Sequence, residues 1–427
     1  MALVVKNGRL INPATGEDKI CDIRIDGTKI TAIGPDVDIQ DADILDATGL
    51  VVTPGLIDMH VHLRQPGQSA KETIESGTKA AAAGGFTRVA TMPNTKPVID
   101  SAIIVDGLKY KIADEGVVKV DIIGSLSKGL EGKELSSMGS MSKAGVVAFS
   151  DDGRYVQNCD FMRKAMEYAG MFGKIVIDHC EDADLIEGGH MHEGVVSHEL
   201  GLKGRPAVAE DIAVARDILL AEATGTAVHI AHISTKNAVQ MVRQAKAKGL
   251  KVTAEATPQH MILTDEALRS YDPRFKVNPP LRSEEHRKAV VEGLVDGTID
   301  AIVTDHAPHT IEEKDCEFSL APSGFVGLET SLGTVLTYLY HAGIVDLMTL
   351  IRAMTSSPAA LLGVDAGNVA VGKAADLTIM DLNKEWTVDS DKFYSKGKST
   401  PFEDMILKGK AVATIVDGKI VMKDGEV

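Results

Sequence analysis

Two histidines separated by a single residue, His60 and His62, are the first side chains whose type and spacing indicate chemistry. They close the run Pro54-Gly55-Leu56-Ile57-Asp58-Met59-His60-Val61-His62-Leu63-Arg64, which predicts a short buried β-strand. Because side chains alternate along a strand, both imidazoles point to one side and can hold one metal ion. Imidazole suits zinc and its neighbours. The pair therefore predicts a metal site, although histidines also occur in ordinary strands with satisfied hydrogen bonds.

Ligand-type side chains also close several later apolar runs. They are Asp152 before Gly153, His179 in Asp178-His179-Cys180, His232 in Ala231-His232-Ile233, and Asp305 in Thr304-Asp305-His306. Taken singly, each fits an ordinary turn residue or a histidine bonded to a backbone carbonyl. Their repeated placement at strand ends favours a shared site.

Four histidines and two aspartates exceed the four ligands of one zinc ion, so we expect two zinc ions per chain. The expected division is Asp152 bridging, His60, His62 and Asp305 on the first ion, and His179 and His232 on the second. A hydroxide between the ions would be the nucleophile. Asp305 would accept its proton and pass it to the leaving nitrogen as general base and then acid.

A second set of residues predicts a small acidic substrate. Arg64 offers a bidentate fork for a carboxylate, Asn94 and Asn278 offer amide donors, and His309 follows Asp305 by four residues. A surface ion pair for Arg64 and a plain turn at Asn278-Pro279-Pro280 are the ordinary alternatives.

The elements that must position these residues alternate between apolar strands and amphipathic helices, which is typical of βα units. Counting the strand before His60, eight strands are predicted, so we expect a (β/α)₈ TIM-type barrel with its site at the C-terminal strand ends. Predicted helices include 72–83, 209–223, 235–248 and 284–295, and 182–206 is a long connection. Short β-type runs at both ends predict a small β-sandwich accessory domain. We place it at 1–52 and 365–427, around a barrel at 53–364.

Composition narrows the function classes. A formal net charge of −16 argues against nucleic-acid binding. The four cysteines show no metal-knuckle spacing, which favours reduced thiols. The N-terminus lacks a signal-peptide pattern, and no apolar run reaches membrane-spanning length. We therefore expect a cytoplasmic protein that binds neither nucleic acid nor membrane.

Together these residues resemble the amidohydrolase superfamily, and within it the bacterial class I dihydroorotases. The match covers nearly the whole chain, through the motifs above and Gly84-Gly85-Phe86-Thr87, Met92-Pro93-Asn94-Thr95 and Val277-Asn278-Pro279-Pro280. The resemblance implies zinc at the six ligands, catalysis by Asp305, and a place in pyrimidine biosynthesis. The implied reaction is reversible hydrolysis of (S)-dihydroorotate to N-carbamoyl-L-aspartate. The implied substrate contacts are His62, Arg64, Asn94, Asn278, His309, Ser323 and Gly324.

Three further points follow from the resemblance. Gln259 replaces a histidine that relatives often carry, which concerns local packing. Many superfamily members bridge their metals with a carboxylated lysine, whereas this chain offers Asp152, so hydantoinases and allantoinases are the second choice. A non-catalytic, transcarbamoylase-binding homologue is the third, marked by missing ligands. We also expect a homodimer, a transcarbamoylase as a candidate partner, and a candidate lid at Gly153-Arg154-Tyr155.

Overall fold

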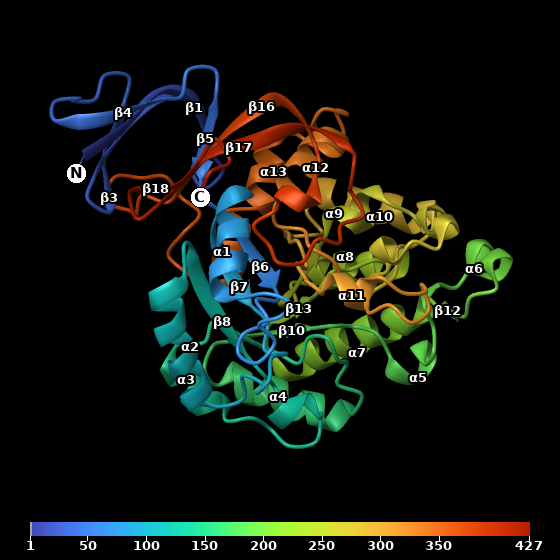
Figure 1. Ribbon diagram of the computed structural model, residues 1–427. Coiled ribbons are helices and arrows are strands. Elements are labelled where there is room, and N and C mark those ends of the chain that lie inside the picture. The colour runs from blue at the N-terminus through green and yellow to red at the C-terminus, as the bar shows by residue number, and fades with distance from the viewer. Residues whose placement is uncertain (1) are drawn as a thin grey trace.

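The computed structural model describes residues 2–427 and is built around a barrel of parallel strands (Figure 1). Within these residues the strand order is β6-β7-β8-β9-β10-β13-β14-β15, and a parallel bridge between Val61 and His306 brings the two edges together. The predicted TIM-type barrel is thus confirmed. The strands are β6 (Leu56–Val61), β7 (Phe86–Thr91), β8 (Lys119–Gly124), β9 (Ala148–Ser150), β10 (Ile175–Asp178), β13 (Val228–Ile230), β14 (Val252–Ala256) and β15 (Ala301–Ile302).

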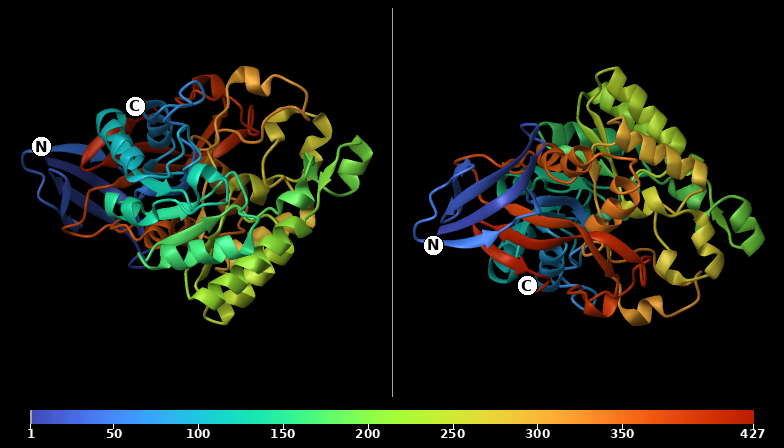
Figure 2. Two further views of the ribbon diagram at one scale, coloured as in Figure 1. Left: turned by 90° about the horizontal axis from the view of Figure 1, so that it is seen from below. Right: turned by 90° about the horizontal axis from the view of Figure 1, so that it is seen from above.

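Helices surround the strands in both perpendicular views (Figure 2). In α4, Phe161, Met162, Ala165, Met166 and Ala169 form one buried face, and the Asn158 side chain accepts the N–H of Phe161 as an N-cap. The outer helices are α1 (Ile74–Ala83), α2 (Ala102–Glu115), α3 (Met138–Ala144), α4 (Cys159–Gly170), α7 (Val208–Thr224), α8 (Lys236–Ala247), α10 (Glu284–Val295), α13 (Leu347–Ala353) and α14 (Ser356–Leu362).

The first helix begins later than predicted. α1 starts at Ile74 rather than at residue 72, because Thr73 is the N-cap and shares a capping box with Ser76. The Glu72 side chain instead turns inward, where its carboxylate is 3.1 Å from His306 Nε2. This tertiary contact removes Glu72 from the helix.

The connection between β10 and α7 contains short elements of its own and projects from the barrel (Figure 1). They are α5 (Ala183–Ile186), β11 (Met191–His192), α6 (Val195–Leu200) and β12 (Gly204–Arg205). Three further short helices follow strands or loops at the barrel: α9 (Pro258–Ile262), α11 (Ile311–Lys314) and α12 (Ser331–Val335).

Both ends of the chain build a second sheet beside the barrel. β5 pairs antiparallel with β16, which joins the N-terminal strands to the C-terminal ones as predicted. The order is β18-β17-β16-β5-β1-β2-β3, with β4 beside β1. The strands are β1 (Ala2–Asn12), β2 (Glu17–Asp26), β3 (Lys29–Gly34), β4 (Ala42–Asp46), β5 (Val51–Pro54), β16 (Leu377–Thr387), β17 (Ile406–Val416) and β18 (Lys419–Lys423).

The second sheet is fastened to the barrel near the start of β6. Gly55 donates its N–H to Asp376, and Thr378 donates its hydroxyl to the Gly85 carbonyl. A Cβ on Gly55 would lie 2.0 Å from Thr87 Oγ1, so only glycine permits this approach. These contacts therefore fix the start of β6 against the second sheet. None of the helices in residues 2–427 is long and apolar enough to span a bilayer.

Candidate functional site

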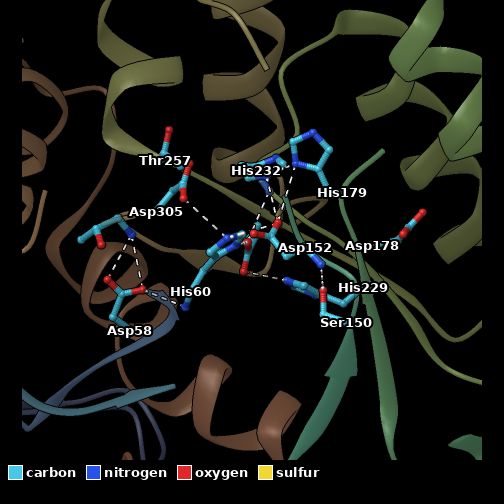
Figure 3. Close-up of polar contacts among 12 residues, drawn as sticks. Asp58, His60, Ser150, Asp152, Asp178, His179, His229, His232, Thr257 and Asp305 are labelled. Atoms are coloured by element: carbon cyan, nitrogen blue, oxygen red, sulfur yellow. Dashed lines mark hydrogen bonds and ion pairs between the residues drawn. The ribbon is translucent and has the colours of Figure 1, made fainter. Parts of the chain in front are cut away.

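The six predicted metal ligands lie at one mouth of the barrel. Figure 3 labels five of them: His60, Asp152, His179, His232 and Asp305. His60 is in β6, and the others lie in or just after this strand, β9, β10, β13 and β15. Parallel strands present their C-terminal ends at the same rim, which is why residues far apart in sequence converge here. The predicted ligands are His60, His62, Asp152, His179, His232 and Asp305.

Two compact groups of ligand atoms share His60. In the first, His62 Nε2 and His60 Nε2 lie 3.1 Å and 3.6 Å from Asp305 Oδ1. The second contains His60, Asp152 and His232. His179 joins this second group through its Nδ1, which is 2.9 Å from His232 Nε2.

Asp152 occupies the centre of the cluster. Its Oδ1 lies 3.5 Å from His60 Nε2, 3.6 Å from His232 Nε2 and 3.7 Å from His179 Nδ1. Its Oδ2 lies 3.4 Å from His62 Nε2. One carboxylate thus faces all four imidazoles, the arrangement expected of a bridging ligand.

These separations fit metal ligands better than hydrogen-bond partners. N···O distances above 3.2 Å are long for hydrogen bonds. Two ligand atoms each about 2.1 Å from a tetrahedral zinc ion lie about 3.4 Å apart. In the described part of the chain, buried His60 Nε2 and Asp152 Oδ1 lack hydrogen-bond partners. Orphaned lone pairs at this spacing are what a bound cation would satisfy.

The local electrostatics also favour a cation. Burial opposes ionisation of Asp152, but the charge of His60 and contacts with His179 and His232 outweigh it and hold its pKa well below the usual range. Burial likewise opposes charge on His179, yet Asp152 and Glu181 raise its pKa to about 10. The cluster therefore stabilises positive charge among its carboxylates.

Three side chains fix which ring nitrogen faces the cluster. His60 Nδ1 donates to Glu255 Oε1 at 2.6 Å, and His62 Nδ1 donates to Asn94 Oδ1 at 2.8 Å. His179 Nε2 lies 3.2 Å from Glu181 Oε2. Since a carboxylate only accepts, His60 and His179 carry hydrogen on these outer nitrogens, so the inner nitrogen is the one that would give up its proton and offer a lone pair to a metal ion.

Three carboxylates without a predicted role also support the site: Glu181, Glu255 and Asp58. The Glu181 carboxylate also accepts from Arg205 at 3.1 Å, so the long connection supports His179. Asp58 accepts the backbone N–H groups of His60 and Thr304, each at 3.1 Å, and burial raises its pKa to about 7. In the sequence, only their positions near predicted strand ends could have indicated a role for these three carboxylates. Most of the residues that they contact are remote in sequence.

A cavity of about 250 Å³ opens over the cluster. All the predicted substrate-binding residues line it: His62, Arg64, Asn94, Asn278, His309, Ser323 and Gly324. Arg64 Nε donates to the Pro308 carbonyl at 3.1 Å, while its terminal nitrogens make no hydrogen bond within residues 2–427. Their roles remain predictions, but the fold brings the whole set together.

Hydrogen bonds orient the amide groups in this cavity. Asn94 Oδ1 accepts from His62, and Asn278 Oδ1 accepts from the Ser323 hydroxyl at 3.0 Å. Both amides are therefore oriented with their NH₂ groups available as donors. The Gly324 N–H already donates to the Lys276 carbonyl, so a contact from this residue would use another atom.

His309 is held on both ring nitrogens. Nε2 donates to the Ser323 carbonyl at 2.9 Å, and Nδ1 lies 3.2 Å from Glu313 Oε2 and 3.3 Å from Lys71 Nζ. Burial, assisted by the charges of Arg64 and Lys71, lowers the pKa of His309 to about 4. The imidazole is thus neutral near pH 7.

Gln259 and the candidate lid, both noted in the sequence, lie close to the site. Gln259 is buried and donates to the Thr304 carbonyl at 3.2 Å, next to the Asp305 loop. The candidate lid starts at Gly153, which lines the cavity with φ of +82°, and continues to Tyr155, whose ring lies 4.2 Å from the Arg216 guanidinium. Lid motion stays a prediction.

Comparison with known proteins defines the class first. Two sequence-family models match the chain. The family described as "Amidohydrolase family" matches residues 332–422, and the family described as "Dihydro-orotase-like" matches residues 49–238. An L-hydantoinase (dihydropyrimidinase) from Arthrobacter aurescens superposes with a TM-score of 0.90 at 28% identity, covering 100% of this chain and 97% of that one. The fold is therefore that of an amidohydrolase barrel.

Full-length relatives are more specific. A dihydroorotase of Pelotomaculum thermopropionicum is 53% identical over 424 residues, 99% of each chain. One of Geobacter metallireducens is 51% identical, over 99% of this chain and 100% of its own. The chain belongs to the dihydroorotase family.

Proposed function

We propose that this protein interconverts (S)-dihydroorotate and N-carbamoyl-L-aspartate in pyrimidine biosynthesis. As a member of the dihydroorotase family, the protein is a hydrolase that acts on cyclic amides. The observation that carries the specific reaction is the position of Arg64, whose terminal nitrogens are unused beside the ligand cluster. A cyclic amide with a carboxylate matches that arrangement.

We also propose that two zinc ions occupy the cluster. The support is the spacing of the ligand atoms, the orphaned His60 and Asp152 atoms, and the two groups that share His60. When bound, the ions would supply Lewis-acid activation of water and of the substrate carbonyl. Asp152 would bridge them as an unmodified side chain, in contrast to a carboxylated lysine.

Asp305 is the proposed proton carrier. Its side chain is buried, its Oδ1 lies 3.1 Å from His62 Nε2, and it also lines the cavity. Burial works against its charge, but contacts with His62 and the charge of His60 lower its pKa. The ionised carboxylate accepts a proton from the attacking water and delivers it to the ring nitrogen as the amide bond breaks.

The other cavity residues hold the substrate. Arg64 pairs with the carboxylate through two parallel N–H bonds, which fixes the position of the ring. The NH₂ groups of Asn94 and Asn278 donate to substrate oxygens. Neutral His309 shapes the wall next to Ser323.

We propose a cytoplasmic homodimer that can associate with a transcarbamoylase. The support for the cytoplasmic location is the four cysteines, all of which are unpaired thiols among the described residues. Sedimentation of the purified protein, alone and with a transcarbamoylase from the same cell, tests both associations.

The decisive experiment compares substrates on one metal-replete preparation. Hydrolysis of dihydroorotate far faster than of hydantoin or allantoin supports the proposal. Preference for hydantoin, the type of substrate suggested by the structural neighbours' names, would reject it. Protein that binds no zinc after metal-replete expression, and turns over no cyclic amide, would instead favour a non-catalytic partner protein.

A further inference from the structure

A fully buried glutamate, Glu255, joins the two groups of metal ligands from beneath. It lies in β14, and its side chain has no exposure to solvent. Oε1 accepts from His60 Nδ1 at 2.6 Å and from the backbone N–H of His232 at 3.3 Å. Glu255 therefore contacts one ligand through its ring and another through its backbone.

The second oxygen of Glu255 is held by a histidine outside the ligand set. Oε2 accepts from His229 Nε2 at 3.1 Å, and His229 Nδ1 accepts from the Thr253 hydroxyl at 2.8 Å. His229 lies beside the cluster in Figure 3. Because the carboxylate has no hydrogen to give, each neighbouring ring must direct an N–H toward it. The hydrogen-bonded series Thr253–His229–Glu255–His60 thus has one consistent set of donors and acceptors.

This series of hydrogen bonds determines which ring nitrogen of His60 faces the cluster. With hydrogen fixed on Nδ1, His60 has Nε2 as the nitrogen that can bind a metal ion, and this atom lies 3.5 Å from Asp152 Oδ1. That Nε2 has no hydrogen-bond partner in the described chain. His60 is also the histidine shared by both ligand groups. An error in its orientation would weaken the ion that His60 holds and shift the bridging Asp152 beside it.

The contact with His232 constrains an unusual backbone. His232 has φ of +31°, a region that L-residues rarely adopt. The backbone of Glu255 reinforces its side chain here, since its carbonyl accepts the N–H of Ile233 at 2.9 Å. Two hydrogen bonds from one residue therefore hold the turn that carries His232.

A purely structural reason for Glu255 is weak. Placing a carboxylate in the interior costs several kcal/mol unless its hydrogen bonds are satisfied, and an apolar side chain of similar size commonly serves packing as well. The side-chain donors to Glu255 within residues 2–427 are the two imidazoles of His60 and His229. Its contacts are directed at ligands rather than at the fold in general.

We propose that Glu255, itself held by His229, is a positioning residue that orients His60 and His232 for metal binding. This inference rests on the proposed metal site. It assigns the sixth and seventh barrel strands a supporting function beneath the ligands. Glu255 contacts neither the substrate cavity nor the reacting atoms.

The test measures metal binding separately from turnover. Glu255→Gln keeps the size but replaces one acceptor with an NH₂ donor that opposes an imidazole N–H. We expect zinc affinity, measured by chelator competition, to fall about 10- to 100-fold. With cobalt in place of zinc, the visible absorption should change, because the ligand geometry changes. The KM for dihydroorotate should change less than kcat.

His229→Gln is the second variant, and it leaves the Glu255–His60 contact in place. A smaller loss of zinc affinity in the same direction is expected. Glu329→Gln is the matched control, since the Glu329 carboxylate is partly buried and accepts from the backbone N–H groups of Tyr394 and Ser395. It should bind zinc like the unaltered protein. If Glu255→Gln does not fold, His229→Gln alone decides the matter.

The outcomes separate this inference from the proposed function. Unaltered protein that binds no zinc would reject the metal site itself. Unaltered protein that binds two ions, with both variants showing normal zinc affinity and cobalt spectra, would reject only the role of Glu255. A drop in the unfolding temperature of the metal-free variants with normal zinc affinity would likewise make Glu255 a structural residue.

Discussion

His179 Nδ1 lies 2.9 Å from His232 Nε2, although 53 residues separate the two histidines in the chain. His179 carries hydrogen on Nε2, which faces Glu181, and its pKa of about 10 places a second proton between Nδ1 and His232 near pH 7. Two ring nitrogens at this distance need either a shared proton or a common cation. The proposed second ion meets that need.

Replacing one of these histidines should therefore cost one ion. We expect His179→Asn to reduce bound zinc from two ions per chain to about one, since His60, His62 and Asp305 form a separate group. Zinc content after gel filtration is the measurement. His198→Asn, on an exposed part of α6, should retain both ions. A variant of His179 that still holds two ions would contradict its assignment as a ligand.

Asp305→Ala should separate chemistry from metal binding. Removing the proton carrier should lower kcat by about 10³-fold, the middle of the range for general acid–base groups. Most of the metal should remain, because five other ligands persist. Steady-state kinetics and zinc content measured on one sample test this. Asp315→Ala, an exposed aspartate in the same region, is the control. Loss of metal in parallel with activity would make Asp305 primarily a ligand.

Arg64→Met should mainly harm use of the carboxylated substrate. A buried, charge-assisted pair is worth about 1.5–3 kcal/mol, so kcat/KM for dihydroorotate should fall about 10- to 100-fold. The slow reaction with hydantoin, which has no carboxylate, should change much less. Arg163→Met on the surface of α4 should leave both unchanged. Equal losses on the two substrates would show that Arg64 supports the site and not the anion.

The neutral state of His309 predicts a dependence of stability on pH. Its pKa of about 4 in the folded protein lies below its ordinary value of 6.5, chiefly because it is buried. Between these values the unfolded chain binds more protons, so stability falls as the pH falls. The contribution of His309 between pH 7 and pH 5 is about 2 kcal/mol.

Urea unfolding of the metal-free protein measures this effect without acid-driven loss of metal. The free energy of unfolding should decrease less between pH 7 and pH 5 in His309→Asn than in the unaltered chain. His198→Asn, which replaces an exposed histidine, should behave like the unaltered chain. The same decrease in all three proteins would show that His309 titrates normally in the fold.

Much of the barrel and its rim is determined by local sequence. Apolar runs followed by polar residues define most strands, and the 284–295 helix has the bounds observed for α10. The alternation of side chains in β6 sends His60 and His62 to one cluster, as expected from their spacing. Because all parallel strands end at one rim, the six ligand positions follow from the chain once the fold class is known.

Only the tertiary structure decides how those ligands are supported. Glu255 lies 195 residues from His60, and no local pattern indicates that closing the barrel brings its carboxylate under that ring. Glu72 continues a helical pattern but is withdrawn from α1 by its contact with His306. Hydrogen bonds between remote strands depend on register and distance, which residue types and spacing do not specify. The sequence thus predicts the candidate ligand set, and the packed barrel determines its geometry.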